Sequence, residues 1–318
     1  MSSNEMTRQE QEKHVAPPVS KPPFSWLTDR WMSFAFVMPT LLILIFIAIY
    51  PLIWSLSASF TDRTLLSNPD NIEWVGAENY VELLTDDNPW ERFITTGRIV
   101  GPSVLIELLL GFGIAMLLNR KFAGRSVLMT MMLIPMMLSP VVVALFWRFM
   151  MQGNGVLNYY ISNVLGFEPI LWLSSRNIIP WSVVLVDVWM WTPFMMLIAL
   201  AGLSAVPKYL YEAAEVDRAG AWFRFRHITL PIVAPLLMIG IIFRVMEAYK
   251  MIDIIFVLVG DRGGSGRAAQ TAGLYVYDLA FKNFDTGLGS AYGYIMLVVI
   301  IALANLLIRQ LNSFKGGQ

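Results

Sequence analysis

The chain has 318 residues, of which 56% are hydrophobic and 14% are charged, and its formal net charge is zero. An average soluble domain has about 25% charged residues, so this composition indicates a protein whose solvent is lipid. A chain without net positive charge gives no reason to expect nucleic-acid binding. With no cysteine and with only His14 and His227, the sequence lacks the residues for disulfides, thiolate chemistry or a multi-histidine metal site.

Six stretches are apolar enough to cross a bilayer as helices, since one span needs about 20 residues. They cover residues 33–57, 99–118, 127–147, 178–202, 232–258 and 289–308. The first begins too late in the chain, and runs too long, for a cleaved signal peptide. The predicted fold is therefore all-α: a mostly disordered tail over residues 1–30, a transmembrane domain over 31–312 and a short tail over 313–318.

Lysine and arginine predict the orientation. With six spans, both termini lie on one side of the membrane. Segments 1–30, 119–125, 204–230 and 309–318 hold 13 Lys and Arg residues in 74 positions, whereas the opposite segments hold 8 in 101. Because positive residues concentrate in cytoplasmic loops, we expect both termini and the 204–230 loop to be cytoplasmic.

Six charged residues lie at predicted membrane depth: Glu107, Asp187, Arg244, Glu247, Lys250 and Asp253. Each would cost roughly 2.5–3.5 kcal/mol at the centre of a lipid-facing helix. The last four share one span, in steps of three and with alternating sign, so they would be neighbours on a helix. They predict either an ion-pair ladder that binds this helix into the bundle or a lining of the substrate path. A proton relay is a third interpretation.

Aromatic residues accompany these charges. Trp189 and Trp191 lie near Asp187, and Tyr249 precedes Lys250. Binding sites for small molecules combine aromatic faces with a few polar groups. Trp189, Trp191, Glu247 and Tyr249 are therefore candidates for lining a substrate path, and helix packing is the alternative role of the tryptophans.

The loop over residues 204–231, SAVPKYLYEAAEVDRAGAWFRFRHITLP, predicts a short amphipathic helix. Pro207 suits its beginning and Gly220 its end, which places it over Lys208–Ala219. Its carboxylates are Glu212, Glu215 and Asp217. A helix this acidic is poorly suited to an anionic leaflet, so a protein partner is the better interpretation.

In this loop and elsewhere the sequence resembles the permease subunits of bacterial binding-protein-dependent ABC importers, in the carbohydrate group that includes the maltose and glycerol-3-phosphate permeases. The resemblance covers nearly the whole chain. Its motifs are MPTLLIL, IYPLIWSL, VGAENY, LLNRKFAGR, GNGVLN, WMWTPF, LAGL and KMIDIIFVL. The cytoplasmic EAA loop of the family appears as Glu212, Ala213, Ala214, Asp217, Gly220, Leu230 and Pro231. Many members have glycine where this chain has Arg218, so we expect the turn at Gly220.

The resemblance implies a permease of the bacterial inner membrane with no catalytic residue, cofactor or metal of its own. A second, homologous permease would complete the path for a sugar, polyol or glycerol phosphate. Two cytoplasmic ATPase subunits would bind ATP and Mg, and a soluble periplasmic or extracellular binding protein would deliver the substrate. The EAA loop would fit a cleft on the ATPase, with Glu212 as its anchor. The alternatives are a secondary transporter, whose expected inverted repeat is not visible, and a passive channel.

Overall fold

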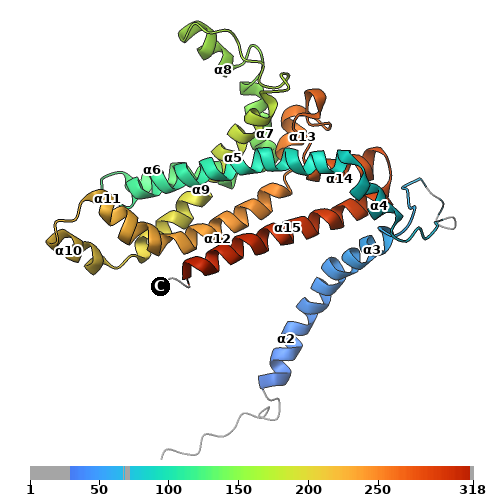
Figure 1. Cartoon of the computed structure of the whole chain (residues 1–318), viewed down its shortest axis with the longest axis horizontal. Helices are drawn as coiled ribbons and strands as arrows, with labels where there is room; N and C mark the ends of the chain where they lie inside the picture. Colours follow the sequence, from blue (N-terminus) through green and yellow to red (C-terminus); the bar gives the residue numbers. More distant parts are fainter. Residues whose placement is uncertain (1–28, 67, 69–71, 316–318) are drawn as a thin grey trace, which may run out of the picture. The chain divides into compact units, whose positions relative to one another are not determined.

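The computed structural model describes residues 29–66, 68 and 72–315, which fold into helices joined by turns (Figure 1). Among them, five helices are long and apolar enough to cross a membrane, or six when one sharply bent pair counts as a single span. The predicted all-α membrane fold is thus confirmed. The predicted tails, residues 1–30 and 313–318, lie outside the described residues except for the helical positions 29–30 and 313–315.

The chain forms two compact units, one that ends at Trp54 and one that begins at Ser55. The first contains α2 (Asp29–Leu44), the π-helical segment η1 (Ile45–Ile49) and most of α3 (Tyr50–Ala58). These helices cover the predicted span 33–57. Phe36 and Phe46 are exposed, as expected for a helix surrounded by lipid. The single domain over 31–312 stays a prediction.

Helix α9 (Ile179–Ala205) is the central element of the second unit. Its principal neighbours are α5 (Asp87–Leu118), α12 (Leu230–Tyr249) and α6 (Arg125–Met137). Two-thirds of the most apolar window of α9 is buried, which explains why the helix is apolar on every side. The backbones of α5 and α9 come so close at Gly111 that a β-carbon there would lie 2.7 Å from the Met196 nitrogen.

Three predicted spans are confirmed as single helices, each of which extends past at least one predicted end. Helix α9 covers 179–202 and ends at Ala205, and α15 (Thr286–Lys315), which packs against α12, covers 289–308. Helix α5 covers 99–118 but begins at Asp87, because the Asp86 side chain caps it by accepting a hydrogen bond from the Asn88 nitrogen at 3.1 Å.

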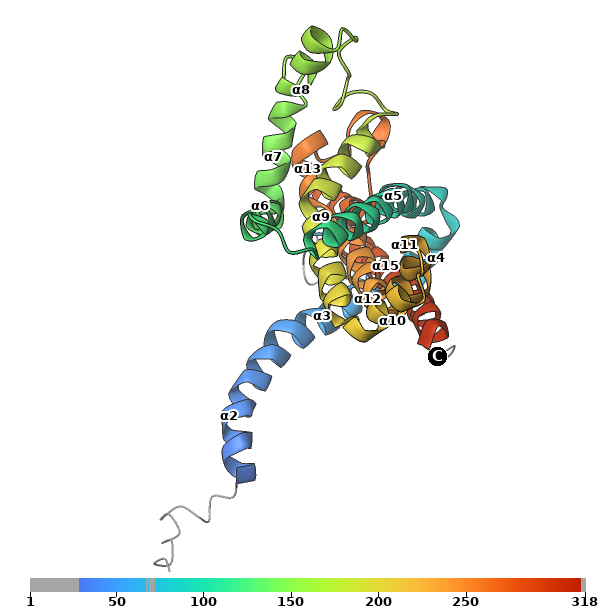
Figure 2. The ribbon, with the colours of Figure 1, turned by 90° about the vertical axis from the view of Figure 1, so that its left-hand side faces the viewer.

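The other two predicted spans are not continuous. The span 127–147 consists of α6 and α7 (Pro140–Met150), whose axes differ by 97° (Figure 2). Pro140 disfavours helical backbone at the residue before it and so explains the break. The span 232–258 ends as α12 at Tyr249 and continues as α13 (Asp253–Val259). The prediction of uninterrupted helices was wrong at both places.

Short helical segments form the connections. They are α4 (Glu78–Thr85), α8 (Val156–Tyr159), η3 (Tyr160–Val164), α10 (Lys208–Val216), α11 (Ala221–Arg224), η4 (Phe225–Thr229), η5 (Ser265–Arg267), α14 (Ala272–Tyr277) and η6 (Asp278–Lys282). Helices α10 and α11 lie at the end of α12 opposite to α13 (Figure 1). The second unit therefore has two distinct ends, joined by α9 and α12.

Candidate functional site

A buried ion cluster ties three spans together. Arg244 of α12 contacts Glu107 of α5 through two atom pairs, Nε to Oε2 at 2.8 Å and Nη2 to Oε1 at 2.9 Å. Its Nη2 also lies 2.6 Å from Oδ1 of Asp187 on α9. All three side chains are at most 1% exposed. Charges removed from solvent to this extent persist only when paired, so the cluster favours one arrangement of α5, α9 and α12.

Of the ion-pair ladder predicted along one helix face, the pair of Glu247 and Lys250 is present, but Arg244 does not take part in it. Arg244 pairs across the bundle and not with Glu247, because a buried guanidinium needs buried partners, and α5 and α9 supply them. Helix α12 also ends at Tyr249, so the regular spacing does not continue to Asp253. Glu247 and Lys250 do pair, at 3.1 Å, but both are more than half exposed. Such exposed pairs contribute only about 0–1 kcal/mol.

A small polar cavity of about 80 Å³ lies beside the cluster, where the two broken spans meet. Pro140 at the start of α7 lines it, as do Met251 and Ile252 between α12 and α13, and α7 packs against α13. Interrupted helices at membrane depth occur where backbone lines a cavity or is buried in protein. Sites for small molecules measure roughly 300–1,000 Å³, so the cavity is too small for a sugar in this conformation.

Two of the four predicted path residues line this cavity. Trp191 and Glu247 are both in its wall, together with Asp187 and Arg244. The Trp191 ring centroid lies 4.8 Å from Cζ of Arg244, within the range of a cation–π contact. Trp191 thus connects the aromatic surface of the cavity to the buried ion cluster.

The structure does not bring the other two predicted path residues to the cavity. Trp189 packs edge to face against Trp147, with 5.8 Å between ring centroids. Tyr249 is buried and stacks with Phe93 at 6.3 Å. Both are packing residues here, because the rotation of α9 and the end of α12 turn them toward neighbouring helices.

The predicted amphipathic helix of the 204–231 loop is present as α10. Pro207 occupies its N-cap, as the sequence predicts, and Lys208 is its first residue. The helix ends at Val216, three residues before the predicted end at Ala219. Leu230 and Pro231 begin α12.

The end of α10 is a Schellman C-cap. The Ala219 nitrogen donates to the Ala214 carbonyl at 2.8 Å, and the Arg218 nitrogen donates to the Glu215 carbonyl at 3.0 Å. Arg218 has φ of 54°, whereas Gly220 has an ordinary φ of −65°. The turn predicted at Gly220 is therefore at Arg218, in the left-handed conformation where glycine is unstrained and an L side chain is not.

One face of α10 borders a groove of about 490 Å³. Its lining residues are Leu210, Ala213, Ala214, Asp217, Ala219, Gly220, Phe223 and Ile228. Four of the predicted coupling residues, Ala213, Ala214, Asp217 and Gly220, thus belong to one concave surface. Glu212 is exposed and does not line the groove.

The outward face of α10 places an acid between two apolar side chains. Tyr209 and Val216 are 65% and 83% exposed. Glu212, also exposed, lies three residues after Tyr209 and four before Val216, so all three share one face. Contiguous exposed apolar surface with a polar rim is typical of contact with a protein partner.

Packed side chains connect α10 to the buried ion cluster. The hydroxyls of Tyr211 and Thr229 are 2.8 Å apart, which joins α10 to the segment before α12. Tyr211 also packs against the apolar cluster that includes Val206, at the end of α9, and Val233 of α12. From Leu230 to Arg244, α12 rises by roughly 21 Å at 1.5 Å per residue. A displacement of α10 therefore has a continuous mechanical route to the cluster.

Glu107, Asp187 and Arg244 were predicted to lie at membrane depth, but their pairing was not predicted. An indication was present: two acids and one base lie in three different spans, and each needs a partner away from lipid. The pairing itself depends on helix rotation, which periodicity does not fix when α9 is apolar on every side.

The family model of the binding-protein-dependent transport system inner membrane component matches residues 107–314. The probable ABC transporter permease protein y4oQ of Sinorhizobium fredii is 37% identical over 283 residues, which cover 89% of this chain and 90% of that protein. The trehalose/maltose transport system permease protein MalF of Thermococcus litoralis is 33% identical and covers 85% and 90%, respectively.

The fold is also that of a chain in the crystal structure of a bacterial alginate ABC transporter in complex with an alginate pentasaccharide-bound periplasmic protein. The TM-score is 0.75 and the identity 20%, with 90% of this chain and 96% of that chain covered. The chain belongs to the family of binding-protein-dependent transport system inner membrane components and is a multi-pass permease subunit of an ABC importer.

Proposed function

We propose that this permease forms half of the translocation path for a sugar or a related polyol. The similarity to the trehalose/maltose permease supports this substrate class. The path would pass the cavity where α7, α12 and α13 meet, with Trp191 as the aromatic surface and Glu247 as a polar contact. A second, homologous permease would supply the opposite wall, which agrees with the small volume of the cavity in one subunit.

The outward face of α10 is the observation that carries the coupling role. It would fit a cleft on a cytoplasmic ATPase subunit, with Tyr209 and Val216 buried in the cleft and Glu212 paired with a basic group. Two such ATPases would bind ATP and Mg, and this chain would need no cofactor. The denser positive charge of the 204–230 loop supports a cytoplasmic position for α10 and for both termini.

Coupling would work through rigid elements with two positions. Closure of the ATPases would displace α10, and the Tyr211–Thr229 contact would pass this displacement to α9 and α12. The breaks after Met137 and Tyr249 allow helix segments to change angle without the deformation of a whole span. The path would then open alternately to the outside, where a soluble binding protein delivers the substrate, and to the cytoplasm.

Charge reversal at Glu212 tests this role. In the reconstituted complex we expect Glu212→Lys to abolish uptake and substrate-stimulated ATP hydrolysis, because an unpaired or repelled charge in a partly buried contact costs several kcal/mol. The matched control is Glu82→Lys, which reverses an exposed acid on α4, away from α10. Normal ATPase coupling and co-purification in Glu212→Lys would reject the proposal.

A secondary transporter and a passive channel were the alternatives that the sequence alone left open. Both would work without an ATPase, so the composition of the native complex separates them from the proposal. We expect a stoichiometric ATPase in the purified complex. Uptake by this chain in the absence of any ATPase would instead support one of the alternatives.

A further inference from the structure

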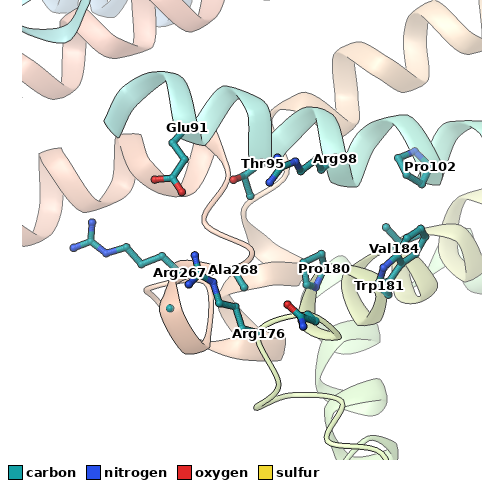
Figure 3. Close-up of a pocket in the computed structure, with 12 residues that line it drawn as sticks. Glu91, Thr95, Arg98, Pro102, Arg176, Pro180, Trp181, Val184, Arg267 and Ala268 are labelled. Carbon is teal, nitrogen blue, oxygen red and sulfur yellow. The ribbon is translucent and has the colours of Figure 1, made fainter. Parts of the chain in front are cut away.

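A second cavity, of about 500 Å³, lies at the opposite end of the bundle from α10. Helix α5 forms one wall with Glu91, Thr95 and Arg98, spaced so that all three lie on one helix face. Arg176, before α9, and Arg267, in the loop before α14, come from the opposite wall (Figure 3). The cavity thus collects three guanidinium groups from segments far apart in the sequence.

These arginines lack acidic partners within the part of the chain that the structure describes. The ion pairs found there involve Arg92, Arg244, Lys250 and Lys282 instead. Glu91, the acid in the wall, pairs with Arg92 at 2.9 Å, so its charge is already matched. With three arginines and one acid in its wall, the cavity therefore has an excess of positive charge.

The loop that presents Arg267 has a strained backbone. Arg267 has φ of 55°, and Gly266 before it has φ of 61°. A β-carbon at Gly266 would lie 3.2 Å from Cδ of Arg176, so the glycine leaves room for the Arg176 side chain to pack against the loop. A left-handed non-glycine residue is strained and persists where the surrounding structure holds it in place. The local structure thus holds two of the arginines side by side.

Charge argues against an anionic cargo as the occupant. The smaller cavity further along α9 and α12 contains three acids, Asp187, Glu247 and Asp253, against two bases, Arg244 and Lys250. An anionic substrate that crossed the bundle would have to leave the positive cavity and then enter the smaller, negative one, and both steps are electrostatically unfavourable. A carboxylate that stays in the positive cavity does not have to enter the negative one.

We propose that this cavity is a docking site for an acidic side chain of the soluble binding protein. The inference rests on the proposed function, which places this end of the bundle outside. Arginine binds carboxylates through paired, charge-assisted hydrogen bonds, and three arginines would fix both the position and the orientation of the docked protein. The exposed Trp181 in the same wall would provide apolar contact next to the ion pairs.

The test uses the whole complex, with its ATPases and second permease, in nanodiscs. We expect the triple variant Arg98→Gln, Arg176→Gln and Arg267→Gln to raise the Kd of the purified cognate binding protein at least about tenfold at low salt and to flatten its salt dependence. The basal ATPase activity should not change. The control Arg262→Gln removes a neighbouring exposed arginine that does not line the cavity and should bind as the wild type does.

Three results would overturn the inference. One is an unchanged Kd in the triple variant, and another is an equal loss in Arg262→Gln, which would indicate a general charge effect. The third is binding of glucuronate alone to the wild-type complex but not to the triple variant, which would show a site for a free anion. If the triple variant fails to assemble, the single Gln variants are measured in its place. An intact, ATP-hydrolysing complex with an unchanged Kd rejects this inference alone, whereas a complex without an ATPase rejects the proposed function.

Discussion

Replacing Arg244 with methionine isolates the energetic role of the buried ion cluster. The substitution retains an unbranched apolar side chain but leaves Glu107 and Asp187, at 0% and 1% exposure, without their shared cation. Removing one partner of a buried ion pair costs about 3–5 kcal/mol, because the remaining charge is neither hydrated nor paired. Here two carboxylates are left together, so we expect the upper part of that range.

The purified permease complex in detergent provides the assay. At about 2–4 °C per kcal/mol, a loss of about 4–5 kcal/mol in Arg244→Met should lower Tm by roughly 8–20 °C. Asp187→Asn is the matched control, since it retains the two contacts between Glu107 and Arg244 and removes one excess negative charge. It should cost only about 0.5–1.5 kcal/mol, the typical contribution of one hydrogen bond.

A further variant separates lost pairing from lost packing. Combining Arg244→Met with Glu107→Gln and Asp187→Asn removes all three charges, and the Tm should recover most of the loss, because no uncompensated buried charge remains. The reasoning is refuted if Arg244→Met keeps the wild-type Tm, or if the neutral triple variant is no more stable than Arg244→Met.

Three other predictions follow from backbone geometry and orientation. Arg218→Gly should stabilise α10 by about 1 kcal/mol, because glycine adopts the left-handed conformation of this C-cap without strain, and hydrogen exchange in α10 should become slower. The control Gly220→Ala, at φ of −65°, should have no effect, and faster exchange in Arg218→Gly would contradict the prediction. Gly111→Ala should destabilise the protein by about 1–3 kcal/mol, because its β-carbon would meet backbone atoms of α9. The control Gly113→Ala has open space around it and should keep the wild-type Tm, so equal melting temperatures of the two variants would contradict the close helix contact. Glu215→Cys, the single cysteine of the chain, should resist a membrane-impermeant thiol reagent in intact cells and react after lysis, and labelling in intact cells would reverse the proposed topology.

Apolar run length alone was sufficient to locate the membrane-spanning segments. Helices α9 and α15 and the first span follow directly from stretches of about 20 apolar residues, because the bilayer thickness sets the length of a span. The start of α10 at Lys208 was likewise predicted, although Pro207 is its N-cap, with extended backbone, and not part of the first turn. These features depend on neighbours in the sequence and on the solvent.

The ends and breaks of helices depend on contacts that are distant in the sequence. The bend before Pro140 and the gap between α12 and α13 interrupt two predicted spans, and the length of an apolar run does not show where such breaks fall. Only their position beside a shared cavity shows why non-helical backbone is tolerated there. The preference of left-handed turns for glycine predicted that α10 turns at Gly220, but the hydrogen bonds of the C-cap place this turn two residues earlier, at Arg218.

The sequence by itself determined that charged residues lie within the spans and that the helix carrying most of them could not face lipid on all sides. Tertiary structure alone decided which charges meet. Arg244 and Glu247 are three residues apart, but Arg244 instead joins Glu107 and Asp187, which are 137 and 57 positions away in the chain. The reason is physical: a neighbour on an exposed helix face offers about 0–1 kcal/mol, whereas a buried guanidinium requires carboxylates that share its low-dielectric surroundings.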